Sequence, residues 1–440
     1  MKKVSRRAIA ALVLAGILLA GVLVFAVRYF TQGARWATFA GNPHTAGVGT
    51  VTDRSGTVLL SGGQYTEDEL LRRATVHLLG DPGGNVPATV TTAYAPELAG
   101  YNAWNGLRGA ESRRTKLELT VDAEVQKTAL QALNGKTGTV LVYNYATGEL
   151  LCAVSSTTFD PAAPLPEAPE DGLYINRAFR AAYTPGSIFK LVTAATALEV
   201  LPDAETETFT CEGTFQIGKD TITCTGVHGE VDLREALAKS CNCAFAQLAL
   251  KLGREALTER VERWQITKPC EFDGITTETG HFDLTDTADS ELAWAGIGQY
   301  TDLVNPCAYL QFVGTIAGGG GAAKPYLVRT AGDYQAKTTR VTTMTADAAE
   351  RLAEDMAYNV ISVYGVGSFP PVTVCAKSGT AEVGPDQTPH ATFTGFIRDQ
   401  EYPLAFFIAV EHGGSGSAVG TPIAGTVLRA CVAAMDAQKK

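Results

Sequence analysis

The sequence predicts an α+β fold in which one antiparallel sheet is assembled from segments far apart in the chain. Two strand-like stretches joined by a turn occupy residues 137–156, and three more occupy 372–383, 391–399 and 403–412. Long helical stretches fill the chain between these two groups. Strands at both ends of a domain with helices between them indicate a single five-stranded antiparallel sheet, with helices segregated onto its faces.

Two further helices frame this domain. Asp122 can cap a helix that ends near Leu133, and a final helix from Ile423 to Met435 would pack its apolar face onto the sheet. We therefore expect the main domain to span residues 117–440.

The N-terminus predicts a membrane anchor. Residues 8–27 carry no charge, which is about the length needed to cross ~30 Å of hydrocarbon as a helix. Four basic residues precede them, so the positive-inside bias places the N-terminus in the cytoplasm and the rest of the chain outside. A cleaved signal peptide shares the basic start, but its apolar core is usually shorter. We expect residues 1–30 to form a cytoplasmic tip with an uncleaved transmembrane helix, and residues 31–116 a small pedestal domain that starts with a strand pair around Arg54–Gly56.

Charge and cysteine content narrow the possible partners. The formal net charge of −10 over 440 residues leaves no basic stripe that could neutralise phosphates, so we expect no nucleic-acid partner. Nine cysteines cannot all pair, and Cys211 and Cys224, which flank a predicted hairpin, are the best candidates for a disulfide. Cys241 and Cys243 invite a zinc interpretation. However, residues two apart on a helix point away from each other, and no nearby Cys or His pair completes a set, so we expect no metal and no cofactor.

The sharpest chemical signal is the segment TPGSIFK at Thr184–Lys190. A Pro-Gly pair just before an apolar run marks a helix start, so Ser187 would lie in the first turn with Lys190 on the same face. The helix is apolar nearly all round, and burial lowers the pKa of a lysine toward the neutral, basic form. A serine beside such a lysine is an activated nucleophile. Alone, a Ser-x-x-Lys pair is a weak signal, because most of them are ordinary helix surface.

Two further motifs carry polar side chains. Ser240 and Asn242 follow the helical segment 232–239, and they can aim at one cleft if the helix breaks between them. Lys377–Thr380 reads Lys-Ser-Gly-Thr in an otherwise apolar strand, which suits an edge where a substrate backbone lies and its carboxylate meets the lysine and hydroxyls. Alone, the first motif also fits a polar helix junction, and the second a solvent-facing strand edge.

Ser-x-x-Lys, Ser-x-Asn and Lys-[Ser/Thr]-Gly in this order resemble the signature of serine β-lactamases and penicillin-binding proteins. The similarity runs from about Leu117 to the C-terminus, and residues 49–60 resemble the stretch that class B penicillin-binding proteins carry just after their anchor. The segments that carry it are LTVDAEVQ, VLVYNYATGELLCAVSSTTFDP, INRAFRAAYTPGSIFKLVTAATALE, EALAKSCNCAF, GIGQ and KSGTAE. The chain is identified as a member of this class, of the penicillin-binding protein 2 or division transpeptidase type, which implies a serine β-lactamase/transpeptidase-like domain.

The resemblance implies a peptidoglycan D,D-transpeptidase. Ser187 would attack the penultimate D-Ala carbonyl of a stem peptide, with Lys190 as general base. Ser240 would relay a proton to the leaving amine, and Asn242 would hold the substrate amide. Lys377 would supply positive potential that also keeps Lys190 neutral.

The resemblance also places substrate binding along the Lys-Ser-Gly-Thr strand. Ser378 and Thr380, on either side of Gly379, would bind the terminal carboxylate. The backbone N–H groups of Ser187 and Thr380 would form an oxyanion hole. Ser378 stands where the family usually has Thr, which keeps the hydroxyl, and Thr392 stands where Trp is frequent.

The resemblance implies stem peptides as substrates, β-lactams as covalent inhibitors and a polytopic glycosyltransferase as a partner. A β-lactamase shares the three motifs but must hydrolyse its acyl-enzyme, and a D,D-carboxypeptidase differs only in its acceptor. A β-lactam sensor would need a cytoplasmic output domain, whereas seven residues precede the anchor. Septation, elongation and spore formation remain open as roles.

Overall fold

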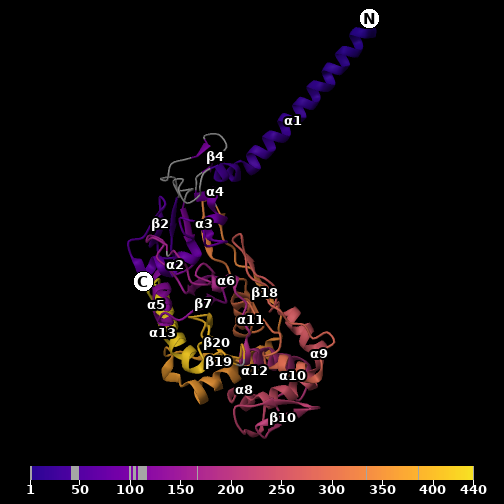
Figure 1. Cartoon of the computed structure of the whole chain (residues 1–440), viewed down its shortest axis with the longest axis vertical. Coiled ribbons are helices and arrows are strands. Elements are labelled where there is room, and N and C mark those ends of the chain that lie inside the picture. The colour runs from indigo at the N-terminus through magenta and orange to yellow at the C-terminus, as the bar shows by residue number, and fades with distance from the viewer. Residues whose placement is uncertain are drawn as a thin grey trace.

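The computed structural model describes residues 2–40, 49–98, 101–102, 106–107, 116–165, 167–332, 334–384 and 386–439. A long N-terminal helix, α1 (Lys2–Ala40), extends away from a body that contains the other elements (Figure 1).

The centre of the body is a five-stranded antiparallel sheet in the order β19-β20-β21-β7-β8. Its strands are β7 (Gly138–Asn144), β8 (Leu150–Ser156), β19 (Val374–Ala381), β20 (His390–Ile397) and β21 (Leu404–Val410). The early and late strand groups join where β21 pairs with β7 along the full length of both strands. The predicted sheet of five strands from distant segments is therefore confirmed.

One face of this sheet packs on the first and last helices of the predicted main domain. Val140 and Val142 of β7 share a core with α5 (Ala123–Leu133) and α13 (Gly416–Ala437). The carboxylate of Asp122 accepts hydrogen bonds from the N–H groups of the first turn of α5, as its capping role predicts.

The other face packs on helices from the middle of the chain. Leu141 and Tyr143 alternate with the two valines along β7 and belong to a second core, which α11 (Pro306–Ala317) and α12 (Ala346–Asn359) help to close. Because both faces are covered, every residue of β7 is buried, which explains why its sequence is a continuous apolar run rather than an alternating one.

A second sheet lies between the main sheet and α1. It has the order β17-β16-β6-β1-β2-β3, and the predicted strand pair around Arg54–Gly56 forms its β1–β2 hairpin. Two of its strands come from inside the 117–440 segment, so the sheet draws on both sides of the predicted domain boundary. Its strands are β1 (Thr50–Thr52), β2 (Val58–Ser61), β3 (Gln64–Tyr65), β6 (Lys116–Leu119), β16 (Val328–Ala331) and β17 (Tyr334–Gln335). The division at residue 116 stays a prediction. Within the predicted pedestal domain, residues 41–48, 99–100, 103–105 and 108–115 lie outside the described residues.

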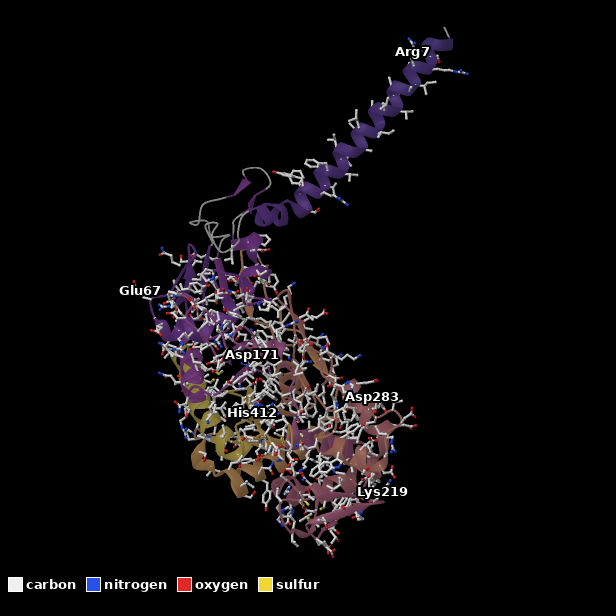
Figure 2. The ribbon with its side chains drawn as sticks, in the orientation of Figure 1. Arg7, Glu67, Asp171, Lys219, Asp283 and His412 are labelled. Carbon is white, nitrogen blue, oxygen red and sulfur yellow. The ribbon has the colours of Figure 1, made fainter. Side chains whose placement is uncertain are left out.

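Among the described residues, two helices are long and apolar enough to cross a membrane. Ser5–Thr31 within α1 has a mean hydropathy of 2.9 and is not buried against the body, and its side chains stand clear of it (Figure 2). Gly416–Ala437 has a mean hydropathy of 1.4 and is partly buried on the sheet, as expected for a core helix. This helix starts earlier than the predicted Ile423, because the Ser415 side chain caps it.

The cysteine predictions need correction. All nine cysteines are free thiols, so the predicted Cys211–Cys224 bridge is wrong. The predicted hairpin is present as β10 (Thr214–Ile217) and β11 (Asp220–Thr223). However, Sγ of Cys224 lies 3.8 Å from Sγ of Cys241, and the fold also gathers Cys211 and a histidine there. The expectation that Cys241 has no Cys or His pair nearby is therefore also wrong.

Candidate active site

The predicted nucleophile lies in a tight turn that leads into a buried helix. Ser187 belongs to a single 3-10 turn, η2 (Gly186–Phe189), and α7 (Lys190–Val200) follows without a break. Gly186 has a φ of +58°, and a Cβ there would lie 2.8 Å from the Thr380 carbonyl oxygen. A glycine is therefore required for this turn to approach β19 so closely.

Lys190 is fully buried beside this serine. Its Nζ lies 3.1 Å from Oγ of Ser187, 2.7 Å from the carbonyl oxygen of Ser240, 3.2 Å from Oγ of Ser240 and 2.7 Å from Oδ1 of Asn242. Burial lowers the pKa of Lys190 to about 8, because an ammonium group loses its hydration there. The first two predicted motifs therefore meet at one amine.

The helix breaks at the Ser-x-Asn motif, as its chemistry requires. The helix α8 (Leu233–Ala238) ends just before it and α9 (Asn242–Arg263) starts within it, with Cys241 as the N-cap residue. Ser240 has a φ of +51°, in the left-handed region that costs a non-glycine residue about 1–2 kcal/mol. This turn directs the Ser240 hydroxyl and the Asn242 amide at the same lysine.

Lys377 brings the third motif into the same cluster. It is fully buried, and its Nζ donates hydrogen bonds to Oγ of Ser240 at 3.1 Å and to the carbonyl oxygen of Ser378 at 2.7 Å. Burial, and then repulsion from Lys190, hold the pKa of Lys377 well below its usual range. For Lys190 itself burial is the main cause, rather than the predicted effect of Lys377. Because repulsion between two ammonium groups is mutual, the pair disfavours a doubly charged state.

The rest of the third motif lies at the sheet edge, as predicted, since β19 is the outermost strand. Gly379 is needed there, because a Cβ would lie 2.3 Å from Oγ1 of Thr392 and 2.8 Å from the Pro185 carbonyl oxygen. Side chains alternate along a strand, so Ser378 and Thr380 do not join the buried cluster around Lys377. Ser378 is partly exposed and Thr380 is exposed, which leaves both hydroxyls accessible to a ligand.

Three residues that the motif analysis did not assign to the site hold this edge. The hydroxyl of Tyr364 accepts a hydrogen bond from the Ser378 N–H at 2.8 Å and donates one to Oγ of Ser378 at 3.0 Å. Nε2 of Gln299, in the GIGQ segment, donates to the Thr380 carbonyl oxygen at 3.0 Å. Thr392 is buried, and its hydroxyl donates to the carbonyl oxygen before Gly186 at 2.9 Å, so it supports the nucleophile turn instead of facing a groove.

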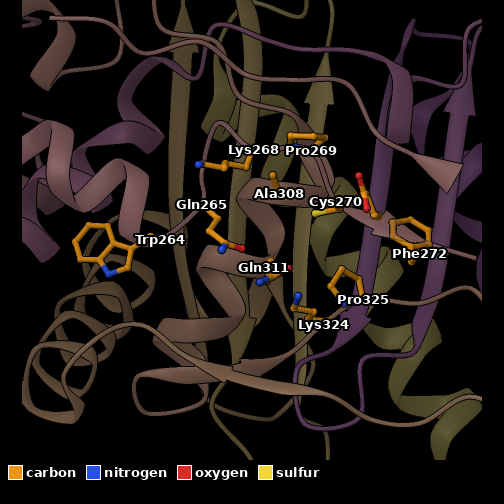
Figure 3. Close-up of a pocket in the computed structure, with 11 residues that line it drawn as sticks. Trp264, Gln265, Lys268, Pro269, Cys270, Phe272, Ala308, Gln311, Lys324 and Pro325 are labelled. Carbon is orange, nitrogen blue, oxygen red and sulfur yellow. The ribbon is translucent and has the colours of Figure 1, made fainter.

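A separate cavity of about 230 Å³ shares no residue with the three motifs (Figure 3). It lies between the segment Trp264–Phe272, the α11 residues Ala308 and Gln311, and Lys324 with Pro325. The amine of Lys324 and the amides of Gln265 and Gln311 make its lining polar. We assign it no part in the chemistry of the three motifs.

A serine hydroxyl against a buried lysine, with a second lysine on the adjoining strand, is the arrangement of an active-site serine acyltransferase. The chain belongs to the penicillin-binding protein transpeptidase family, since the family described as "Penicillin binding protein transpeptidase domain" matches residues 138–429. Its relatives include proteins named PbpA and MrdA, so the resemblance to class B penicillin-binding proteins is confirmed.

Several of its relatives are mycobacterial. The chain is 30% identical over 364 residues to "Peptidoglycan D,D-transpeptidase PbpA" of Mycolicibacterium smegmatis, which covers 74% of this chain and 73% of that protein. The crystal structure of PBPA from Mycobacterium tuberculosis matches with a TM-score of 0.76 at 25% identity, over 88% of this chain and 99% of that one. A penicillin G acyl-enzyme complex of penicillin-binding protein A from M. tuberculosis matches with a TM-score of 0.75 at 25% identity, over 88% of this chain and 99% of that one.

Proposed function

We propose that this chain is a peptidoglycan D,D-transpeptidase, which cross-links stem peptides through an acyl-enzyme on Ser187 and is acylated by β-lactams at the same serine. The relatives named D,D-transpeptidase and the penicillin G acyl-enzyme of a similar structure support this proposal. The single observation that carries it is the surroundings of Lys190 Nζ.

A neutral lysine amine has two N–H donors and one lone pair. The carbonyl oxygen of Ser240 and Oδ1 of Asn242, both 2.7 Å from Nζ, can only accept hydrogen bonds. They therefore occupy the two N–H groups of Lys190. The lone pair is left for the Ser187 hydroxyl at 3.1 Å, which is the geometry of a general base with its nucleophile.

In the acylation step, the proton that leaves Ser187 is the proton that the departing amine receives. Lys190 takes the Ser187 proton while Oγ bonds to the penultimate D-Ala carbonyl carbon, and the carbonyl oxygen becomes an oxyanion. The backbone N–H groups of Ser187 and Thr380 stabilise that oxyanion. Collapse breaks the peptide C–N bond, and the departing D-Ala amine receives the proton from Lys190 through the Ser240 hydroxyl, which lies 3.2 Å from Nζ.

Deacylation reverses the same path with a new amine. An amino group of a neighbouring stem peptide gives its proton to Lys190 as it attacks the ester carbonyl. The new C–N bond forms, the Ser187 ester bond breaks, and the serine regains its proton. Asn242 holds the substrate amide throughout both halves of the reaction.

Lys377 links substrate binding to base strength. The substrate carboxylate would bind Ser378 and Thr380 at the edge of β19, beside Gly379 and close to Lys377. A carboxylate raises the pKa of a nearby lysine, so Lys377 becomes the charged member of the pair. Repulsion from that charge then favours the neutral form of Lys190 in the bound complex.

The location follows from the N-terminal helix. We expect residues 8–27 to cross the cytoplasmic membrane once, with the pedestal at 31–116 and the transpeptidase domain at 117–440 outside, where a polytopic glycosyltransferase would supply glycan strands. A reporter that is active only outside the cytoplasm should be active when it is fused after residue 41, and a reporter that is active only in the cytoplasm should be inactive there. Activity confined to the cytoplasm would reverse this topology.

The test of function is mass spectrometry of the intact chain after exposure to penicillin. We expect one adduct on the wild type, none on Ser187→Ala, and an adduct that persists after excess drug is removed. An unlabelled wild type, or a label retained on Ser187→Ala, would refute the site. An adduct that clears within seconds would identify a β-lactamase, and release of D-Ala without cross-linked product from stem peptides would identify a carboxypeptidase.

A further inference from the structure

Two histidines meet at the end of the main sheet, next to the part of β19 that carries Thr380. His390 is the first residue of β20, one position before the strand partner of Thr380, and His412 lies in the turn after β21. Their ring centroids are 4.9 Å apart. His412 is exposed, over the yellow C-terminal part of the ribbon (Figure 2), and His390 is half-buried. Neither histidine belongs to the three motifs.

The hydrogen bonds of this pair require one protonation state. The backbone N–H of His412 donates to Nδ1 of His390 at 3.0 Å. Because a backbone N–H can only donate, Nδ1 of His390 must carry a lone pair, and the neutral ring then holds its proton on Nε2. Nδ1 of His412 lies 2.9 Å from the carbonyl oxygen of Thr388, which can only accept, so this nitrogen carries a proton.

Protonation therefore has different consequences for the two rings. A second proton on His412 goes to Nε2 and leaves the hydrogen bond to Thr388 intact. A second proton on His390 goes to Nδ1, where it faces the backbone N–H of His412, and the hydrogen bond between them is lost. The contact between the two histidines thus exists only while His390 is neutral.

The surroundings of His390 favour its neutral form. Burial, and then repulsion from His412, lower the pKa of His390, whereas Glu411 acts in the opposite direction. The Glu411 carboxylate already has partners, since its Oε1 accepts hydrogen bonds from Nε of Arg177 at 2.8 Å and from the Tyr183 hydroxyl at 3.1 Å. The charged and titratable groups around His390 come from the turn after β21, from α6 (Arg177–Arg180), from the segment before the nucleophile turn and from the end of β19. They are Glu411, His412, Arg177, Tyr183 and the exposed Glu382.

A protonated His390 displaces the turn more easily than its own ring. The ring makes edge contacts with two others, His412 and Tyr183, whose centroid is 6.1 Å away. The backbone that carries the donor is freer, because Gly413 and Gly414 follow His412 and restrict the chain least. His412 itself has a φ of +51°, a conformation that persists only where its contacts determine it.

The same turn reaches the substrate edge of β19. It ends at Ser415, the N-cap residue of α13, and the next residue, Gly416, donates its N–H to Oγ1 of Thr380 at 3.3 Å. Gly416 lies so close to β19 that a Cβ there would overlap the carbonyl oxygen of Gly379. Since only residues 413–415 separate His412 from Gly416, a shift of the turn is passed on to the Thr380 hydroxyl.

We propose that His390 is a positioning residue for Thr380. Neutral His390 fastens the turn 411–416, and the turn holds the Thr380 hydroxyl where the substrate carboxylate binds. Protonation of His390 releases the turn, so acylation weakens in acid independently of the protonation of Lys190. This inference rests on the proposed function, which assigns the Thr380 hydroxyl to the carboxylate.

The acid effect has a defined pH range and sign. Because the pKa of His390 is lowered, its protonation takes place below the ordinary histidine pKa of about 6.5, and the hydrogen bond is fully formed above it. Well below the pKa of Lys190, the neutral fraction of that base falls about tenfold per pH unit. The rate for the wild type should fall more steeply than this once His390 takes up its proton.

The first experiment measures penicillin acylation of the full chain by rapid quench, between about pH 4.5 and pH 7.5. His390→Asn places an amide oxygen at the position of Nδ1 and cannot titrate, so it should match the wild type at neutral pH and fall less steeply in acid. His390→Leu has no acceptor and should be about two- to tenfold slower than His390→Asn at every pH. In acid the wild type should approach the rate of His390→Leu. A wild type that parallels His390→Asn over the whole range, or a His390→Asn as slow as His390→Leu, would overturn the proposal.

The matched control is His412→Asn. It keeps the backbone N–H that His390 accepts, its amide can still donate to Thr388, and asparagine tolerates the left-handed conformation. Without repulsion from His412, the pKa of His390 should rise, so the steeper fall in rate should begin at a higher pH than in the wild type. If the steeper fall disappears instead, the titrating group is His412 and the assignment to His390 is wrong.

The second experiment follows the turn without any ligand. Hydrogen exchange of residues 411–416 is compared between the wild type and His390→Asn at the same pH, so that the intrinsic pH dependence cancels. The two chains should exchange alike at neutral pH, and the wild type should exchange faster in acid. Equal exchange in acid would refute the release of the turn.

Together the two experiments separate this inference from the proposed function. A chain that shows the acid release but is never acylated refutes the transpeptidase proposal and leaves the role of His390 in the turn intact. A chain that is acylated and shows the release, but whose rate follows the protonation of Lys190 alone, refutes the positioning of Thr380 by His390.

Discussion

Replacing Gly186 by Ala tests whether the close contact between the nucleophile turn and β19 sets the rate of acylation. Gly186 has a φ of +58°, and a Cβ there would lie 2.8 Å from the carbonyl oxygen and 2.9 Å from the carbonyl carbon of Thr380. Non-bonded carbon contacts are normally about 3.5 Å, so the turn and the strand must separate by roughly half an ångström. Since a misplacement of about 1 Å can cost ~100-fold in rate, we expect Gly186→Ala to slow penicillin acylation of Ser187 by about tenfold.

The matched control for this variant is Gly62→Ala. Gly62 has a φ of +56°, but a Cβ there would meet nothing within 4 Å. Both variants place alanine in the left-handed region and should lose about 1–2 kcal/mol of unfolding free energy, measured by urea denaturation. In a rapid-quench acylation assay Gly62→Ala should react at the wild-type rate. If Gly186→Ala also reacts at that rate, the contact with Thr380 does not set the geometry of the nucleophile.

Three further predictions concern the base, the carboxylate edge and the helix cap. Burial lowers the pKa of Lys190 to about 8, so the neutral fraction of this base grows as the pH rises. The rate of acylation should therefore increase up to about pH 8 and level off above it. A rate that does not change across this pKa would contradict Lys190 as the base. Tyr364→Phe removes the acceptor of the Ser378 N–H and should cost about 1–3 kcal/mol, seen as at least a several-fold lower second-order acylation constant, and an unchanged constant would exclude this role. Asp122→Ala removes a helix cap and should lower the free energy of unfolding by about 1 kcal/mol without changing acylation. The control Glu124→Gln, on the exposed side of the same turn, loses only an exposed ion pair with Lys127 and should cost at most about 0.5 kcal/mol, also without changing acylation.

The sequence predicted the elements of this fold well where one local pattern determines them. The strands β7 and β21 are fully buried, so each centres on an apolar run between turn residues, and β19 and β20 add shorter apolar stretches interrupted by polar residues. The helix cap at Asp122 and the Pro-Gly start before Ser187 are likewise short local signals. The cluster that the three motifs form was predictable for a related reason, because each motif places its polar side chains within four residues of one another. Their order along the chain then identified the family.

Contacts between distant segments left no such pattern. Tyr364 holds Ser378 from the end of a one-turn π-helix, η3 (Val360–Tyr364), which has no sequence signature. In the sequence Cys241 is a neighbour of Cys243, which suggested that pair, but the fold gives Cys241 partners from across the β10–β11 hairpin. The spacings of twelve residues within this group of cysteine and histidine side chains form no recognisable pattern until the strands on either side are known to fold back.

The strained backbone of the Ser-x-Asn turn gives the neighbouring β10–β11 hairpin a structural role next to Lys190. Ser240 adopts a left-handed conformation that its own sequence does not favour, and such residues persist only where the surroundings determine them. On one side Lys190 donates a hydrogen bond to the Ser240 carbonyl oxygen and Lys377 donates one to the Ser240 hydroxyl. However, both amines are buried groups whose charged forms are disfavoured, and the proposed reaction changes their protonation during each cycle. Contacts that change with every turnover cannot by themselves hold a strained residue. The other side must supply the constant restraint, and there the Asn242 side chain donates to the Thr223 carbonyl oxygen at 2.8 Å while the residue between Ser240 and Asn242 joins the cysteine cluster. The β10–β11 hairpin thus supplies a constant restraint on the Ser-x-Asn turn while Lys190 gains and loses a proton in each cycle.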